Sequence, residues 1–176
     1  MEKFENPPTT ETNENISPTI QEYLQKRNIE GNVIEVSLYS GARIESNPGE
    51  QGQVLITEKL NGCMATIIYT EQKDMKSSAQ LVHFPPFMLD RHLEKISSLT
   101  TQDDVDATKK YALVYLQLKR KENEDAIISH IKTVLGDNVS IHVEYYEAGD
   151  ESDIAGIEIN PEHVVYHVGA KEVDVK

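Results

Sequence analysis

Residues 63–84 read CMATIIYTEQKDMKSSAQLVHF, and this stretch decides the fold. The apolar run Cys63–Thr70 and the alternating run Ala79–Phe84 are both typical of β-strands. The polar residues between them are typical of a turn, so the two strands predict a hairpin. With the loop at Thr70–Lys76, the register would set Cys63 directly opposite His83, with both side chains on one face of the sheet.

The rest of the chain adds strands and helices around this hairpin. Glycines and Pro48 predict a loop from Gly41 to Gly52. About eight strands, two main helices and one short helix predict an α/β or α+β fold, in which a mixed β-sheet or sandwich is layered with the two main helices. The further predicted strands are 34–38, 54–57, 111–118, 139–145, 154–159 and 163–168, and the predicted helices are 19–26, 85–99 and 127–135, the last ending at Gly136.

Length and composition predict one domain preceded by a tail. The chain has 176 residues, which suits a single domain over 19–176. Residues 1–18 hold few large apolar side chains among prolines, threonines, asparagines and glutamates. Such a segment buries too little surface to offset its ordering entropy, so we expect a disordered acidic tail.

Charge and cysteine content exclude several classes of protein. Lys and Arg number 17 against 30 acidic residues, and the formal net charge is −13. This balance opposes binding to nucleic acid or to an anionic membrane. The single cysteine, Cys63, excludes an intramolecular disulfide and a multi-cysteine metal site. No apolar run reaches the ~20 residues of a membrane helix, and we expect a soluble protein in a reducing compartment.

The predicted pairing of Cys63 with His83 is the main chemical feature of the sequence. Opposite side chains in a hairpin have Cβ atoms about 4.5–5.5 Å apart, close enough for proton transfer from a thiol to an imidazole. A neighbouring imidazole can also lower the pKa of a cysteine. The alternative is that Cys63 is a small hydrophobic side chain, buried and inert.

A short segment around Cys63 resembles a known family. Leu60-Asn61-Gly62-Cys63 resembles the Leu-x-Gly-Cys motif of the bacterial toxin glutamine deamidases, the cytotoxic necrotizing factors and the Burkholderia lethal factor. Thr57 lies six residues before Cys63, the spacing of the threonine–cysteine pair in the lethal factor and in the chemoreceptor glutamine deamidases. Residues 79–86 are similar to the strand that carries the family's histidine. The resemblance covers about 30 residues.

The segment also departs from the family pattern. The chemoreceptor deamidases usually have Gly-Ser-Cys where this chain has Asn61-Gly62-Cys63, which favours the toxin branch. The 20-residue gap from Cys63 to His83 requires 71–78 to be an insertion. Asn-Gly is also a strong signal for a two-residue hairpin turn. Such a turn would put the Thr57 side chain on the opposite face, so that only its backbone carbonyl, or a wider loop, could orient His83.

The resemblance implies a protein-glutamine deamidase that needs neither cofactor nor metal. Cys63 would be the nucleophile, His83 the base and Thr57 the group that orients His83. Oxyanion or substrate contacts would come from Leu60, Asn61, Gly62 and Met64. If an amine replaced water, the same site would act as a transglutaminase.

The resemblance also implies a partner and a location. The partner would be a target protein, such as a host Rho-type GTPase or a translation-initiation helicase, modified by an effector that is secreted or delivered into the host cytoplasm. Two alternatives stay open. One is a non-catalytic interaction module with the same fold and an inert, buried Cys63. The other is a chemotaxis-receptor deamidase of the bacterial cytoplasm.

Other candidate sites in the sequence are weaker. His163 and His167 lie on a predicted strand, where their rings would be about 13 Å apart and could not share a zinc ion. The acidic residues of 150–153 lack the spacing of a calcium loop and predict a solvated turn. No serine has the glycine-flanked turn of a serine hydrolase.

Overall fold

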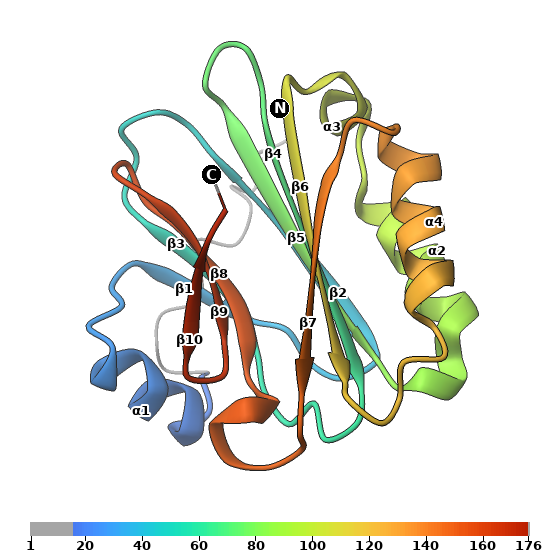
Figure 1. Ribbon diagram of the computed structural model, residues 1–176. Coiled ribbons are helices and arrows are strands. Elements are labelled where there is room, and N and C mark those ends of the chain that lie inside the picture. Colours follow the sequence, from blue (N-terminus) through green and yellow to red (C-terminus); the bar gives the residue numbers. More distant parts are fainter. Residues whose placement is uncertain (1–15, 176) are drawn as a thin grey trace, which may run out of the picture.

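The computed structural model describes residues 16–175, which form two five-stranded sheets facing each other (Figure 1). Each sheet contains one parallel pair, β1 with β3 and β6 with β7, and is otherwise antiparallel. Sheet A consists, in spatial order, of β1 (Asn32–Glu35), β3 (Gln53–Thr57), β8 (Ala155–Ile159), β9 (Val164–Val168) and β10 (Lys171–Asp174). Sheet B consists of β2 (Ser40–Ser46), β5 (Ser77–Phe84), β4 (Met64–Glu71), β6 (Lys109–Gln117) and β7 (Ser140–Tyr146).

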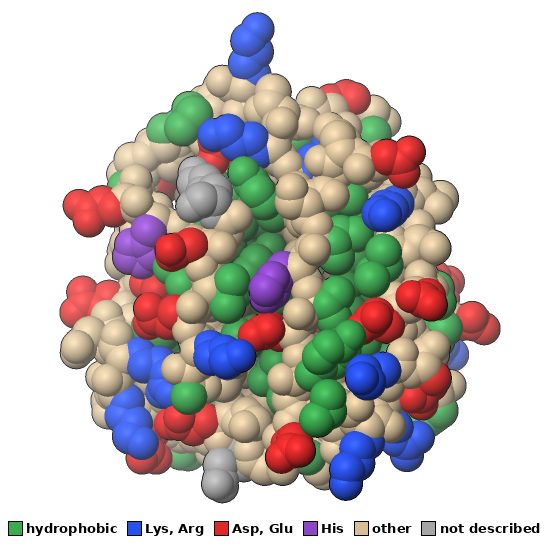
Figure 2. Space-filling view, in the orientation of Figure 1, with side chains coloured by type: hydrophobic (Ala, Val, Ile, Leu, Met, Phe, Trp, Pro, Cys, Tyr) green, Lys and Arg blue, Asp and Glu red, His purple; other side chains and the backbone are tan. Residues whose placement is uncertain are grey.

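The main core fills the space between the two sheets. Successive side chains of a strand point to opposite faces, so every second residue of each strand enters this space. Leu55 and Ile157 reach it from sheet A, and Ile67, Leu81 and Leu113 reach it from sheet B. In Figure 2, hydrophobic side chains show along the middle of the face where the sheet edges β10 and β7 come close.

Helices cover the outer faces of the sheets. α2 (Leu89–Leu99) and α4 (Glu124–Leu135) lie against sheet B, where Ile96 and Ile131 contact a second apolar cluster that includes Ile68 and Val82. α1 (Pro18–Lys26) covers part of sheet A. Three shorter helices, α3 (Gln102–Asp106), η2 (Pro86–Met88) and η3 (Asp150–Asp153), lie in connections. In the part of the chain described here, no helix is long and apolar enough to span a lipid bilayer.

These layers confirm the predicted mixed α/β fold and correct several of its elements. The loop predicted over 41–52 is wrong for Ser40–Ser46, which forms the edge strand β2. Edge strands tolerate charged residues such as Arg43 and Glu45, so they lack the simple alternation of a half-buried strand. The short edge strand β10 and the helix α3 were likewise not predicted. The helix from Pro85 to Leu99 is divided into η2 and α2.

The predicted tail is too long by at least three residues. Ile16 is buried in the cluster beneath α1, and the Ser17 hydroxyl accepts a hydrogen bond from the backbone N–H of Ile20 and so caps that helix. Residues 16–18 therefore belong to the fold. The rest of the predicted tail, residues 1–15, lies outside the described residues.

A buried histidine of α2 makes the fold sensitive to acid. The His92 side chain is 0 % exposed, and its Nε2 lies 2.8 Å from the Thr66 hydroxyl. Its Nδ1 has no hydrogen-bond partner within residues 16–175. Burial lowers the pKa of His92 from 6.5 to about 3, because the charged imidazolium would lose its water. The folded protein therefore holds His92 neutral at pH values where the unfolded chain protonates it.

We expect the free energy of unfolding to decrease as the pH falls from about 6.5 toward 3. Above that range His92 is neutral in both states; within it only the unfolded chain takes up the proton. The loss attributable to His92 between about pH 6.5 and pH 5 is about 2 kcal/mol. Urea unfolding at several pH values measures it. His92→Gln keeps a partner for Thr66 and should show a flatter dependence; equal slopes for both proteins would contradict this explanation.

Candidate active site

The β4–β5 hairpin brings Cys63 and His83 to the same end of sheet B, but not directly opposite each other. Ala65 is the partner of His83, and Met64 is the partner of Phe84. The predicted register is therefore wrong by two positions. The strands continue to Glu71 and Ser77, so the centre of the loop lies one residue later than predicted.

Cys63 and His83 nevertheless face the same space between the sheets. Cys63 lies two residues before Ala65, and it contacts the core between the sheets while staying partly exposed. His83 reaches across to Thr57 of sheet A. In a hairpin, residues that are diagonal neighbours on one face have Cα atoms about 7–8 Å apart, within reach of an aromatic side chain.

The hydrogen bonds of Thr57 determine which nitrogen of His83 carries a proton. The Thr57 hydroxyl donates to the backbone carbonyl of Val36 at 2.6 Å, and its oxygen lies 2.8 Å from His83 Nδ1. A hydroxyl has a single proton to donate. Because the Val36 carbonyl receives that proton, the Thr57 oxygen must accept a hydrogen bond from His83 Nδ1–H. The proton therefore sits on Nδ1, and Nε2 carries a lone pair.

His83 Nε2 is placed as an unused base. Within the described chain this nitrogen is buried and has no hydrogen-bond partner. Burial lowers the pKa of His83 from 6.5 to about 4, so the ring is neutral near pH 7. A neutral imidazole with a free lone pair can accept a proton, which is what a cysteine nucleophile requires of its neighbour.

Thr57 reaches His83 because β3 belongs to the other sheet. The expectation that an Asn61–Gly62 hairpin turn would direct the Thr57 side chain away from His83 is wrong. Asn61 and Gly62 do adopt positive φ angles of 37° and 96°. The segment 58–63, however, crosses from sheet A to sheet B and does not join neighbouring strands of one sheet. Thr57 therefore faces the hairpin across the core.

The segment before Cys63 is fixed by hydrogen bonds from its own N–H groups. The Leu60 N–H donates to the backbone carbonyl of Asp153 at 3.1 Å, and the Asn61 N–H donates to the Asp153 carboxylate, also at 3.1 Å. The Gly62 N–H donates to the Tyr146 hydroxyl at 2.9 Å. These groups were predicted as oxyanion or substrate contacts. In the structure they are already bound within the protein.

Two further features of this segment bear on the predicted site. The Cys63 N–H donates to the Leu60 carbonyl at 2.6 Å, so it too is occupied. The Met64 side chain is buried in the second cluster, beneath α2 and α4, and so faces away from the space that His83 enters. The catalytic role of Cys63, His83 and Thr57, and the substrate contacts of the four flanking residues, remain predictions.

Tyr146 and Asp153 are neighbours of Cys63 that the sequence did not identify. The Tyr146 hydroxyl donates to the Cys63 carbonyl at 2.7 Å while it accepts from Gly62. Asp153 lies in η3, and its carboxylate accepts from Asn61 and Gly149. Both residues come from strands or turns more than 80 positions away, and no local pattern marks them.

The pKa of the Cys63 thiol is raised, although a neighbouring imidazole can lower the pKa of a cysteine. Burial is the larger cause, and the negative charge of Asp153 adds to it. His83 is neutral and so supplies no positive charge to stabilise a thiolate. Proton transfer to His83 would therefore have to accompany attack by the sulfur.

The surroundings of the site offer no evident metal ligands. Among residues 16–175, no group of three or more His, Cys, Asp or Glu side chains is placed to hold a metal ion. The side chains described above can transfer a proton and provide a sulfur nucleophile.

Comparison with known proteins gives a distant similarity in fold. No protein-family model matches the chain, and no curated protein matches it. Among solved structures, the C-terminal domain of CNFy from Yersinia pseudotuberculosis matches 82% of this chain with 11% identity and a TM-score of 0.37. This similarity is limited to the fold. The chain spans 59% of the CNFy chain that it matches.

The tautomer of His83 can be tested directly. We expect the imidazole nitrogens in ¹⁵N NMR spectra near neutral pH to show a proton on Nδ1 and none on Nε2. Thr57→Val removes the acceptor, so the spectrum should change to mixed tautomers. Thr66→Val, the matched change beside His92, should leave the His83 signals unaltered. A proton on Nε2 in the unmodified protein would contradict the hydrogen-bond assignment.

The influence of Asp153 on Cys63 predicts a change in thiol reactivity. Asp153→Asn removes a negative charge and keeps an acceptor for Asn61, so the pKa of Cys63 should fall. Alkylation by iodoacetamide near neutral pH should be roughly threefold faster, the effect of half a pKa unit on the thiolate fraction. Mass spectrometry measures the rate. Asp137→Asn, an exposed change at the opposite end of sheet B, serves as the control and should have no effect.

Proposed function

We propose that this protein is a cysteine-dependent protein-glutamine deamidase. The observation that carries the proposal is the state of His83: Thr57 holds the proton on Nδ1, and Nε2 is left as a buried, unpartnered base. This base faces the same space as the chain's single cysteine. The arrangement supports a nucleophilic reaction of Cys63 at an amide carbon.

The proposed reaction consumes one water molecule and releases one ammonia. His83 Nε2 takes the proton of the Cys63 thiol as the sulfur attacks the side-chain amide carbon of a glutamine. The same proton passes to the amide nitrogen, the carbon–nitrogen bond breaks, and ammonia leaves a thioester on Cys63. His83 then accepts a proton from water, which attacks the thioester. The carbon–sulfur bond breaks and His83 returns the proton to the sulfur, which restores the thiol and leaves a glutamate in place of the glutamine.

Stabilisation of the tetrahedral intermediate requires a rearrangement at the Cys63 segment. An oxyanion needs N–H donors, and removing one such donor from an active site typically costs a few kcal/mol of transition-state stabilisation. The N–H groups of Asn61 and Gly62 donate to Asp153 and Tyr146, and that of Cys63 donates to the Leu60 carbonyl. We infer that the substrate displaces at least one of these acceptors. The structure then corresponds to the resting form of the enzyme.

The proposal extends to a target protein and a setting through the sequence resemblance. The target would be a protein with an accessible glutamine, such as a host Rho-type GTPase or a translation-initiation helicase. The enzyme would be secreted or delivered into the host cytoplasm, and an amine in place of water would give transglutamination. A chemotaxis-receptor deamidase of the bacterial cytoplasm would use the same chemistry on a different target.

A second candidate is a non-catalytic interaction protein with an inert Cys63. The raised pKa of Cys63 and the occupied N–H groups around it favour this alternative. It predicts slow alkylation of the native protein at all pH values below the pKa of an ordinary thiol. The deamidase predicts that Cys63 reacts with glutamine substrates in a His83-dependent manner.

Deamidation can be tested by mass spectrometry on host-cell and bacterial lysates incubated with the full chain. We expect specific glutamines to gain the mass of a glutamate, with ammonia released. Cys63→Ser and His83→Gln should lower the rate at least about 10³-fold, since both residues act on the same step. His142→Gln changes an exposed histidine of β7 and should leave the rate of deamidation unchanged. Conversion that persists in Cys63→Ser would refute the assigned nucleophile.

A further inference from the structure

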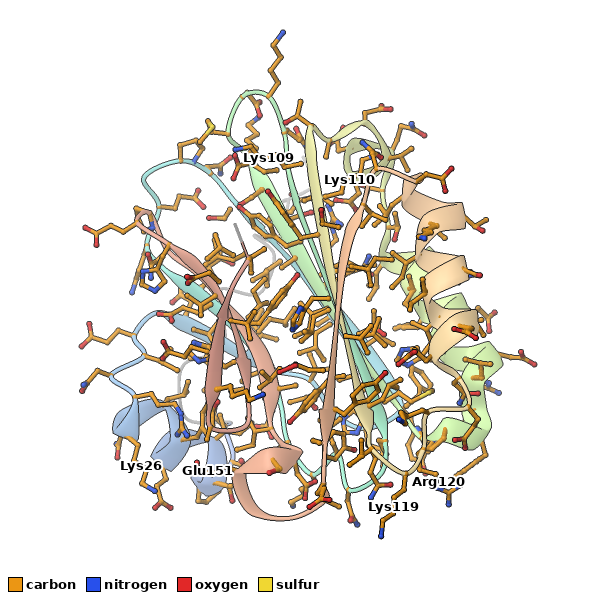
Figure 3. The ribbon with its side chains drawn as sticks, viewed as in Figure 1. Lys26, Lys109, Lys110, Lys119, Arg120 and Glu151 are labelled. Atoms are coloured by element: carbon orange, nitrogen blue, oxygen red, sulfur yellow. The ribbon has the colours of Figure 1, made fainter. Side chains whose placement is uncertain are left out.

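Gln117, the last residue of β6, brings its side chain to the Cys63 segment. Figure 3 labels Lys110 near the start of β6 and Lys119 two residues beyond Gln117, at the other end of the strand. β6 pairs with β4 on the side away from β5. Gln117 therefore approaches Cys63 from one flank, and His83 approaches it from the other.

The pairing of β4 with β6 sets Gln117 opposite Cys63. Ala65 is the partner of Tyr115 in this antiparallel pair, and the same register continued by two residues makes Cys63 the neighbour of Gln117. Opposite side chains in such a pair have Cβ atoms about 4.5–5.5 Å apart. A contact next to Cys63 agrees with this register: a Cβ added to Gly62 would lie 3.3 Å from the side-chain oxygen of Gln117.

Gln117 faces the space between the sheets, as Cys63 and His83 do. Tyr115 lies two residues earlier on β6 and packs in the main core, and alternate residues of a strand share a face. The partner of Gln117 on β7 is Tyr146, which packs in the same core. Gln117 and Cys63 are both only partly buried, so a substrate group can reach them.

The side-chain amide of Gln117 is free to donate a hydrogen bond. It makes no hydrogen bond to any other residue in the described part of the chain. The hydroxyl groups beside it already donate elsewhere. That of Tyr146 donates to the Cys63 carbonyl at 2.7 Å, and that of Tyr115 donates to the Ser152 carbonyl at 2.9 Å. Gln117 differs from these neighbours because its N–H groups are available.

The amide of Gln117 has its oxygen toward Gly62 and its NH₂ group turned away. Its oxygen lies 3.3 Å and its Cδ 3.9 Å from the position of an added Gly62 Cβ, and its nitrogen lies beyond 4 Å. A glutamine amide carries two N–H donors. Gly62 has no side chain to crowd this amide, and its φ of 96° also favours glycine. The segment thus leaves room for a donor beside Cys63.

We propose that Gln117 is a catalytic residue that donates a hydrogen bond to the oxyanion formed when Cys63 attacks a carbonyl carbon. The inference rests on the proposed deamidase function, in which that carbon belongs to a substrate glutamine. As the sulfur–carbon bond forms, the electron pair of the carbon–oxygen π bond moves to the oxygen and the thiol proton passes to His83. The N–H of Gln117 stabilises the negative oxygen. The electron pair returns when the carbon–nitrogen bond breaks.

Gln117 supplies a donor that the resting Cys63 segment lacks. The backbone N–H groups of residues 61–63 are all occupied within the protein. The amide of Gln117 needs no displacement of a protein acceptor before it can donate. An N–H group that the substrate frees from its present acceptor would supply a second donor. His83 on one flank would then take the proton, while Gln117 on the other flank would hold the oxygen.

The test compares two reactions of Cys63 that need no glutamine substrate. Acylation by p-nitrophenyl acetate passes through a tetrahedral oxyanion, whereas alkylation by iodoacetamide at a saturated carbon does not. Gln117→Met keeps the length of the side chain and removes its N–H donors. In the full chain it should lower the rate of acylation at least about tenfold, because an oxyanion donor is lost. The rate of alkylation should stay the same.

Absorbance of the released p-nitrophenolate measures acylation, and mass spectrometry measures modification of Cys63 in both reactions. Cys63→Ala gives the background rate. Gln117→Glu, which keeps the shape of the side chain and also lacks N–H donors, should lower the ratio of the acylation rate to the alkylation rate as well. This ratio cancels any change in the thiolate fraction. Circular dichroism shows whether each variant is folded.

A matched control lies at the opposite end of sheet B. Gln72→Met makes the same change at a partly buried glutamine between β4 and β5, and it should alter neither rate. An unchanged ratio in folded Gln117→Met and Gln117→Glu would overturn the proposal. An equal fall of the ratio in Gln72→Met would overturn it as well, since the effect would not be specific to the candidate site.

Conversion of glutamines in the lysates distinguishes failure of this inference from failure of the proposed function. Equal conversion by the unmodified chain and by Gln117→Met would uphold the deamidase and refute the role of Gln117. Acylation that depends on Gln117, without conversion of any glutamine, would uphold the oxyanion donor and refute the deamidase. Conversion that falls about 10²-fold in Gln117→Met would support both.

Discussion

The candidate site depends on one hydroxyl group that joins the two sheets. Thr57 lies at the end of β3 in sheet A, donates its proton to Val36, and accepts a hydrogen bond from His83 of sheet B. This side chain determines the tautomer of the imidazole and keeps the ring from turning in the core. The hydrogen bond from His83 to Thr57 depends on the packing of the two sheets against each other, because His83 belongs to sheet B and Thr57 to sheet A. Without this contact the His83 imidazole could rotate, and its proton would no longer be held on Nδ1.

The same burial that orients His83 also limits the chemistry of Cys63. Removal of water lowers the pKa of the imidazole and raises that of the thiol, so both groups are neutral near pH 7. A preformed thiolate–imidazolium pair is therefore not the ground state. In the proposed reaction the thiol proton would therefore move to His83 during attack by the sulfur. A substrate that fills the space and displaces Asp153 from the Cys63 segment would remove a negative charge that disfavours the thiolate.

The sheet topology brings several segments of the chain to the end of sheet B where Cys63 lies. β4 runs antiparallel to β5 and β6, and β7 runs parallel to β6, so the start of β4 lies at the same end of sheet B as the ends of β5, β6 and β7. Cys63, His83 and Gln117 come from segments far apart in the sequence. Their common location follows from strand direction.

Part of the candidate site could be predicted because it is local. The apolar run of β4 and the alternation of β5 required a hairpin, and a hairpin with a polar turn brings Cys63 and His83 to one end of a sheet. The exact register could not be predicted, because it depends on which polar residues extend the strands. Glu71 pairs with Ser77 in the structure, so the centre of the turn lies one residue later than predicted, and this moves the register by two positions. The edge strand β2 escaped prediction because its charged residues hide the alternation.

The sequence by itself determined the layered α/β fold, the amphipathic helix that ends at Gly136, and the location of the single thiol at the same end of a hairpin as an imidazole. These features follow from hydrophobic periodicity and from residue identity, which are local properties. Only the tertiary structure decided that Thr57 faces His83, that Tyr146 and Asp153 hold the Cys63 segment, and that the thiol has a raised pKa. Each of these depends on a contact between segments from different sheets or distant turns, and the distance between such segments is set by the packing of the whole core.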